Sequence, residues 1–136
     1  MGLVIDTSAV VDVERLSGEV GDMLSGIGDE PAALPAIVLA ELLVGVRLAR
    51  SRRIAALRRS RVDALRSRVP IVEFGADAAD WWARLFVDLR RAGSSVPAND
   101  LAVASTAMTL GWGVLVGTRD EGHFRLVPGL RVRTLG

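Results

Sequence analysis

The chain has 136 residues, half of them hydrophobic, so we expect residues 1–136 to form one domain with its own core. It contains no cysteine, which excludes disulfides, iron–sulfur clusters, thiolate zinc sites and cysteine nucleophiles. Any metal must therefore be held by oxygen atoms or by the lone His123. The net charge is only +1, and no apolar run approaches the roughly 18 residues of a membrane span. Met1 and Gly2 lead directly into the first predicted strand with no basic region, so we do not expect a secretory leader. We therefore expect a cytoplasmic protein with no membrane partner.

Short apolar runs alternate with segments of helical spacing along the whole chain. The runs predict strands at residues 3–5, 33–34, 71–72, 114–116 and 132–135. The helical spacing predicts helices over residues 10–16, 20–27, 37–48, 51–68, 76–91 and 100–110. Strands that alternate with helices are typical of βαβ units, so we predict an α/β fold, with helices on both faces of a mainly parallel sheet.

Two details of side-chain placement follow from the helical spacing. In the long helix over residues 76–91, we expect Trp81, Leu85 and Leu89 to be buried together with either Phe86 or Val87. Acidic residues of the first two helical segments are expected on solvated faces; they are Asp12, Glu14, Glu19 and Asp22.

The segment from residue 47 to residue 68 is strongly basic. It carries nine arginines against the single acid Asp63, so its local charge is near +8, and it begins with Arg47 and Arg50. Guanidinium groups bind phosphate oxygens in a bidentate manner, which favours a nucleic-acid surface. A solvated helix face, or a surface that pairs with an acidic protein, would have the same composition.

Four acidic residues occupy positions where α/β proteins place functional groups. Asp6 ends the first strand, Asp120 follows the strand at residues 114–116, Asp100 lies in a first helical turn, and Glu41 interrupts an apolar helical face. Each also has a structural explanation. Asp6 could cap a helix, Asp100 could favour a helix dipole, Glu41 could be paired, and Asp120 could be a turn residue.

A cluster of these four carboxylates would need a cation. Carboxylates at close range repel one another, and a divalent ion relieves that repulsion. Because the available ligands are oxygens with a single histidine, Mg²⁺ or Mn²⁺ is expected rather than zinc. Phosphodiester hydrolysis is the chemistry that such a site would serve.

Four sequence motifs resemble those of PIN-domain nucleases, and most closely the VapC-type ribonuclease toxins of toxin–antitoxin pairs. They begin at Leu3 (LVIDTSA), Ala40 (AELLVG), Asn99 (NDLAVA) and Thr118 (TRD), and they occur in that order across the chain. The resemblance implies a three-layer α/β/α sandwich and Mg²⁺- or Mn²⁺-dependent endoribonuclease activity on an RNA substrate. It also implies a homodimer and a cognate antitoxin, a small DNA-binding protein encoded alongside.

The resemblance also assigns roles to individual residues. Asp6 and Asp100 match the main metal ligands, while Glu41 and Asp120 complete the acidic pocket and orient metal-activated water or hold a second ion. The hydroxyls next to the first and fourth acids could donate hydrogen bonds to carboxylates or phosphate; they belong to Thr7 and Thr118. The basic segment, with Arg47 and Arg50, would bind RNA phosphates.

The chain departs from the family near the fourth acid. Many relatives have another aspartate shortly before the phenylalanine that follows this acid, whereas here His123 precedes Phe124. His123 could touch the substrate or be structural, and Glu121 is a reserve candidate for the fourth site.

Two other functions remain compatible with the sequence. A PIN-like module could bind RNA without cleaving it, and an interaction subunit could use its apolar helices only to contact a partner.

Overall fold

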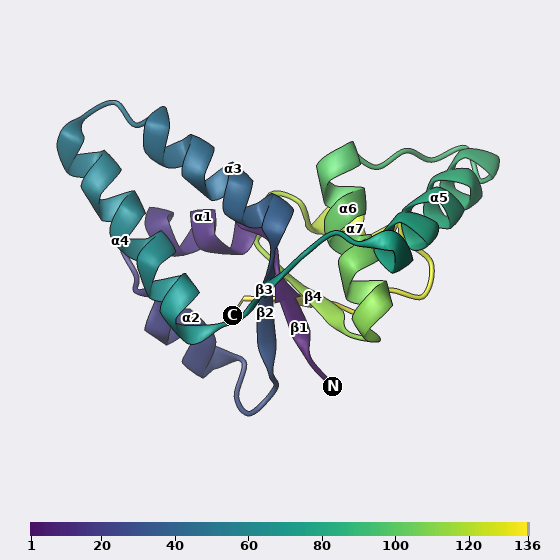
Figure 1. Cartoon of the computed structure of the whole chain (residues 1–136), viewed down its shortest axis with the longest axis horizontal. Coiled ribbons are helices and arrows are strands. Elements are labelled where there is room, and N and C mark those ends of the chain that lie inside the picture. Colours follow the sequence, from purple (N-terminus) through teal and green to yellow (C-terminus); the bar gives the residue numbers. More distant parts are fainter. Residues whose placement is uncertain (136) are drawn as a thin grey trace.

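The computed structural model describes residues 1–135, which form a parallel sheet flanked by helices (Figure 1). The strands are β1 (Leu3–Ile5), β2 (Ala32–Pro35), β3 (Ile71–Val72), β4 (Gly113–Val116) and β5 (Val132–Thr134). The helices are α1 (Thr7–Arg15), α2 (Val20–Gly26), α3 (Ala36–Arg47), α4 (Arg52–Arg68), α5 (Ala76–Arg91), α6 (Ala98–Leu110) and α7 (Glu121–Arg125). Among these helices, none is both long and apolar enough to cross a membrane.

The sheet has the strand order β3-β2-β1-β4-β5, and every pair of neighbouring strands is parallel. Val4 of the central strand β1 is in register with Ala33 on one side and Val114 on the other. The chain leaves β1 in one direction to build β2 and β3, and later adds β4 and β5 on the opposite side. This reversal places the switch point of the topology between β1 and β4, where open α/β sheets bind their ligands.

Helices cover both faces of the sheet, as predicted. Figure 1 shows α1, α2, α3 and α4 on one side and α5, α6 and α7 on the other. The central strands β1 and β4 are completely buried, because their apolar residues contact both helical layers. The expected three-layer α/β/α sandwich with a parallel sheet is therefore confirmed.

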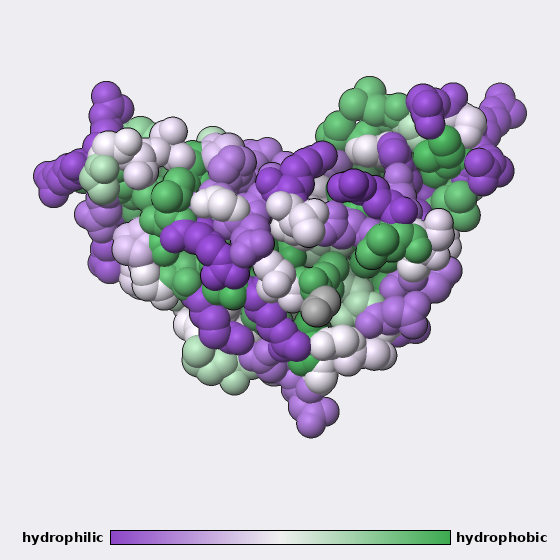
Figure 2. Space-filling view, turned by 180° about the vertical axis from the view of Figure 1, so that it is seen from behind, coloured by the Kyte–Doolittle hydropathy of each residue, from purple (hydrophilic) through white to green (hydrophobic). Residues whose placement is uncertain are grey.

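The helical layers diverge above the carboxyl ends of the strands. In Figure 1 the α3–α4 pair forms one arm, the α5–α6 pair forms the other, and the strands run from the N-terminus toward the space between them. Figure 2 shows from behind that the molecular surface is hollowed between these two arms. The loops after β1 and β4 therefore lead into a concave surface.

The structure corrects three expectations from the sequence. The segment after Asp120 contains the short helix α7 as well as a turn. In α5, Leu85 and Leu89 are buried as predicted, whereas Trp81 is only half-buried. Phe86 and Val87 are both 41% exposed, so the prediction that one of them is buried was wrong. Phe86 instead stacks on Trp82, with ring centroids 5.2 Å apart. Asp12 is buried rather than solvated.

Candidate active site

Asp6 is the residue at which β1 passes into α1. Its backbone is extended, and its side chain caps the helix, with Oδ2 accepting hydrogen bonds from the Ser8 amide at 3.0 Å and from the Ser8 hydroxyl. The side chain is buried, and this burial is the main reason that the pKa of Asp6 rises to about 6. The two bonds from Ser8 lower the pKa, whereas the charges of Asp100 and Asp120 raise it further.

Ser8 connects Asp6 to the loop that follows β4. Its hydroxyl donates to Asp6 and accepts a hydrogen bond from the amide of Gly117 at 2.9 Å. A Cβ atom at position 117 would lie 2.2 Å from the carbonyl oxygen of Ser8, so only glycine fits at this approach of the two backbones. The glycine therefore allows the loops after β1 and β4 to meet at the switch point.

Asp12 makes a second link between α1 and the same loop. Its Oδ2 accepts a hydrogen bond from the Thr118 amide at 2.8 Å, and the Thr118 hydroxyl lies 3.3 Å from the same oxygen. Asp12 lies four residues after Ser8, so the two side chains are on the same face of α1. This spacing could have indicated that Asp12 is buried beside Ser8. Its carboxylate positions the loop that carries Asp120.

Asp100 and Asp120 both lie close to Nδ1 of His123. Asp100 is in the first turn of α6, and its Oδ2 is 2.7 Å from Nδ1 of His123. Asp120 precedes α7, and its Oδ1 is 3.9 Å from the same nitrogen. Burial raises the pKa of Asp100, the hydrogen bond with His123 lowers it, and the Asp120 and Glu41 charges raise it.

Glu41 is held in place by residues from two other elements. The Thr7 hydroxyl donates to its Oε1 at 2.6 Å, and the Asn99 side-chain amide donates to its Oε2 at 3.4 Å. Thr7 starts α1 and Asn99 precedes Asp100 in α6, so Glu41 of α3 lies between the two helical layers. Asn99 was not among the predicted site residues, although it belongs to one of the recognised motifs.

These contacts bring the four predicted acids to one edge of the sheet. Asp6 interacts electrostatically with Asp100 and Asp120, and Asp100 interacts with Asp120 and Glu41. Ligand atoms of Asp100, Asp120 and His123 all lie within 4.8 Å of one another. The other candidate, Glu121, instead binds Arg125 at 2.6 Å.

The donor atoms at this edge suit a divalent cation. Within residues 1–135, both hydrogen bonds to the Asp6 carboxylate fall on Oδ2, so Oδ1 can take a further partner. Carboxylate oxygens are the ligands that Mg²⁺ and Mn²⁺ prefer, and a buried cluster of acids is stabilised when a cation offsets its mutual repulsion.

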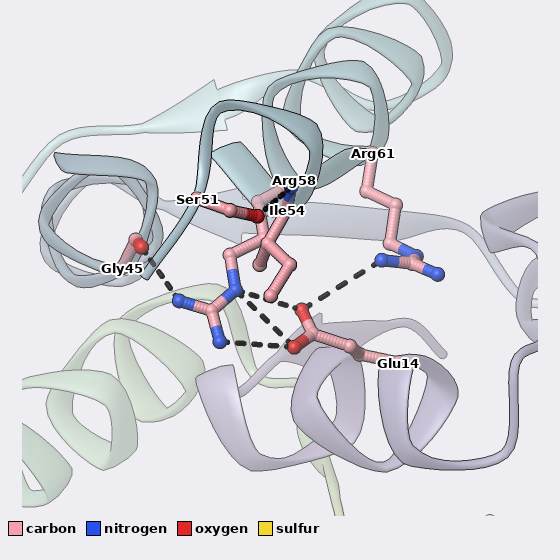
Figure 3. Close-up of polar contacts among 6 residues, drawn as sticks. All are labelled: Glu14, Gly45, Ser51, Ile54, Arg58 and Arg61. Carbon is pink, nitrogen blue, oxygen red and sulfur yellow. Dashed lines mark hydrogen bonds and ion pairs between the residues drawn. The ribbon is translucent and has the colours of Figure 1, made fainter. Parts of the chain in front are cut away.

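The basic segment lies on the α3–α4 arm next to the acidic cluster. Figure 3 shows two of its arginines directed at Glu14 of α1. Arg58 donates to the Glu14 carboxylate at 3.0–3.2 Å and to the carbonyl of Gly45 at 2.7 Å, while Arg61 lies 3.7 Å from Glu14. These two arginines are therefore half-buried and engaged with Glu14, which partly neutralises the positive charge of the segment.

Two adjoining cavities follow this arm. One of about 250 Å³ is lined by Thr7, Glu41 and Arg119, and one of about 410 Å³ is lined by Arg50. Both cavities also share Glu14 and the two arginines that bind it as lining residues. Arg47, in the last turn of α3, is exposed and lines neither of these two cavities.

The fold and this arrangement match a known family. A model of the PIN domain matches residues 3–130 of the chain. The chain belongs to the PIN-domain family. Ribonuclease VapC1 of Rickettsia felis is 33% identical over 138 residues, which cover 99% of this chain and 97% of that protein. Ribonuclease VapC of Rickettsia bellii is 28% identical over 135 residues, with coverage of 99% and 97%.

Solved structures of toxin–antitoxin complexes share this PIN-domain fold. VapBC2 from Rickettsia felis, bound to a DNA fragment from its promoter, has a TM-score of 0.83 and 23% identity, with 100% of both chains covered. VapBC-5 from Mycobacterium tuberculosis has a TM-score of 0.75 and 26% identity, with 98% of this chain and 97% of that chain covered. The prediction of a PIN-like fold of the VapC type is confirmed by these similarities.

Proposed function

We propose that this PIN-domain protein is a Mg²⁺- or Mn²⁺-dependent endoribonuclease and the toxin of a toxin–antitoxin pair. The observation that supports this most is that Asp6 and Asp100 are buried close to Asp120. Burial and the neighbouring negative charges raise the pKa values of Asp6 and Asp100. A divalent cation would stabilise the ionised form of these carboxylates. The similarity to ribonucleases named VapC supports RNA as the substrate.

Asp6, Asp100 and Asp120 are assigned to hold the ion, and Glu41 to complete the catalytic and metal-binding set. When bound, a divalent ion supplies a Lewis acid for the phosphodiester and strengthens water as a nucleophile at neutral pH. Glu41 is fixed by hydrogen bonds to both oxygens, so its orientation is set before the substrate arrives. It is therefore suited to orient the attacking water.

The remaining candidate residues are assigned either to bind the RNA substrate or to orient the acidic side chains. Thr7 and Thr118 have hydroxyls near carboxylates, which supports a role in orienting Glu41 and the loop of Asp120 during RNA binding. Arg50 and exposed Arg47 are assigned to RNA phosphates beyond the scissile bond. Both arginines lie on the arm that carries Glu41, which supports this assignment.

The test is incubation of the purified chain, freed of any partner, with total cellular RNA in Mg²⁺ or Mn²⁺. We expect discrete products that are absent with EDTA and absent with Asp100→Asn, because that variant weakens metal binding without removing a core side chain. RNA that is bound but remains intact in Mn²⁺ would instead favour a PIN-like RNA-binding module without catalysis.

The partner proposals are a cognate antitoxin and a second copy of the chain. Large apolar side chains are exposed on the arms, and exposed apolar clusters are typical of protein interfaces. They include Val44, Leu48, Leu57 and Phe86. The similarity to VapBC complexes supports an antitoxin partner. Expression of the chain alone should arrest growth, and co-expression of the small DNA-binding protein encoded beside it should restore growth.

The homodimer is tested separately by light scattering on the purified chain. A mass of twice 14.5 kDa is expected, and a monomer at micromolar concentration would contradict this part of the proposal.

A further inference from the structure

His123 is the only histidine of the chain, and its side chain lies close to the carboxylates of Asp100 and Asp120. Helix α7 follows Asp120 directly, so one short segment supplies both this carboxylate and the imidazole. Nδ1 of His123 faces Asp100, whereas the neighbouring Glu121 is engaged with Arg125. The imidazole is thus the group of α7 that joins the site. An inference about its role rests on the proposed function of the chain as a metal-dependent nuclease.

The spacing of the donor atoms fits a shared cation. Two ligands about 2.1 Å from an octahedral ion lie about 3 Å apart when adjacent and about 4.2 Å apart when opposite. Nδ1 of His123 is 2.7 Å from Asp100 Oδ2 and 3.9 Å from Asp120 Oδ1. These separations lie close to this range, so small adjustments would bring all three atoms onto one ion.

We propose that His123 is a metal ligand through Nδ1 and that it determines which ion the site selects, favouring first-row transition ions over Mg²⁺. Mg²⁺ takes oxygen ligands and gives up its water reluctantly, whereas imidazole nitrogen is a common ligand of first-row transition metals. A site of carboxylates alone would discriminate less between Mn²⁺ and Mg²⁺. The nitrogen adds affinity for Mn²⁺ that Mg²⁺ does not share.

The direct test is electron spin-echo spectroscopy of Mn²⁺ bound to the tag-free chain. Nitrogen modulation is expected, and it should change when the chain is labelled with ¹⁵N-imidazole histidine. Because His123 is the only histidine, this change can come from no other side chain. Bound Mn²⁺ whose spectrum is the same in labelled and unlabelled protein would overturn the proposal.

A second test measures the Kd values of Mn²⁺ and Mg²⁺ by calorimetry in wild type, His123→Asp and the matched control Arg125→Gln. His123→Asp replaces nitrogen by oxygen at a partly exposed position, so the chain should fold and still bind metal. We expect its preference for Mn²⁺ over Mg²⁺ to fall at least about tenfold. Even a change of a residue that only contacts a metal ligand lowers metal affinity by about 10- to 100-fold, and a direct ligand should matter at least as much. Arg125 is on the same helix and, among the described residues, its side chain binds Glu121 alone, so Arg125→Gln should keep the wild-type ratio.

The outcomes separate this inference from the proposed function. If the chain cleaves RNA with Mn²⁺ but its spectrum shows no nitrogen modulation from histidine, the role of His123 is refuted while the proposed nuclease activity stands. An unchanged ion preference in His123→Asp would have the same meaning. Absence of both Mn²⁺ binding and RNA cleavage in the wild-type chain would refute both.

Discussion

Replacing Asp6 by asparagine should stabilise the metal-free protein while removing metal binding. Ionised Asp6 is buried, and its pKa in the folded chain is about 6 against an ordinary 3.8. This difference corresponds to about 3 kcal/mol at neutral pH, since one pKa unit is about 1.4 kcal/mol. Asparagine has no charge to bury, and its carbonyl oxygen can accept the two hydrogen bonds from Ser8.

The pH dependence of this effect has a definite sign. Between about pH 4 and pH 6 the folded state binds more protons at Asp6 than the unfolded state does, so the wild-type free energy of unfolding falls as the pH rises. Below about pH 4 both states are protonated, and the difference from Asp6→Asn disappears. The stabilisation by asparagine should therefore grow through this window and reach up to about 3 kcal/mol above about pH 6.

The assay is urea unfolding in EDTA at several pH values, with Asp77→Asn as the control. Asp77 is an exposed acid in the first turn of α5, so its replacement should cost only about 0.3–1 kcal/mol through the helix dipole. Mn²⁺ at about 100 times its Kd should stabilise wild type by about 2.7 kcal/mol and Asp6→Asn much less. An Asp6→Asn variant that is less stable than wild type at neutral pH, or a difference independent of pH, would refute the reasoning.

Three further variants test the contacts that shape the site. Gly117→Ala should lower the free energy of unfolding, measured in urea, by about 1–3 kcal/mol or more, because its Cβ would overlap the Ser8 carbonyl. Wild-type stability in this variant would contradict the close approach of the two backbones. Asp12→Ala should lose about 1–3 kcal/mol by leaving the Thr118 amide without its acceptor, and should slow RNA cleavage by displacing the loop before α7. Glu14→Gln should lose at most about 1 kcal/mol, since the carboxylate and its two arginine partners are partly exposed; a larger loss in thermal unfolding would show stronger coupling.

The sequence carried most of the information about the fold because the sheet is parallel and buried. Strands buried on both faces consist of unbroken apolar runs, so β1 and β4 could be recognised directly. Helix α7 was missed because its five residues include Gly122 and are too few for a periodic pattern. Phe86 was misplaced because helical spacing does not reveal which flank of an apolar face another helix covers.

The site was partly predictable for the same physical reason. Acids that end parallel strands meet at one edge, which brings Asp6 and Asp120 together. Asp100 was indicated by its place in a first helical turn and Glu41 by its place on an apolar helical face, and the family motifs include all four acids. The sequence does not reveal contacts between loops far apart in the chain. The hydrogen bond between Asp12 and Thr118 spans 106 positions and depends on the packing of α1 against the loop after β4.

The most direct test of the central claim is the rate of cleavage of one RNA oligonucleotide, taken from a mapped cut site, in saturating Mn²⁺. Asp100→Asn should be slower than wild type by about a hundredfold or more, because it removes the negative charge of an assigned metal ligand, while Asp77→Asn should retain the wild-type rate. EDTA should abolish cleavage, and Mn²⁺ should restore it. Equal rates for wild type and Asp100→Asn, or cleavage that persists in EDTA, would contradict the assignment of the acidic cluster as the metal-dependent catalytic centre.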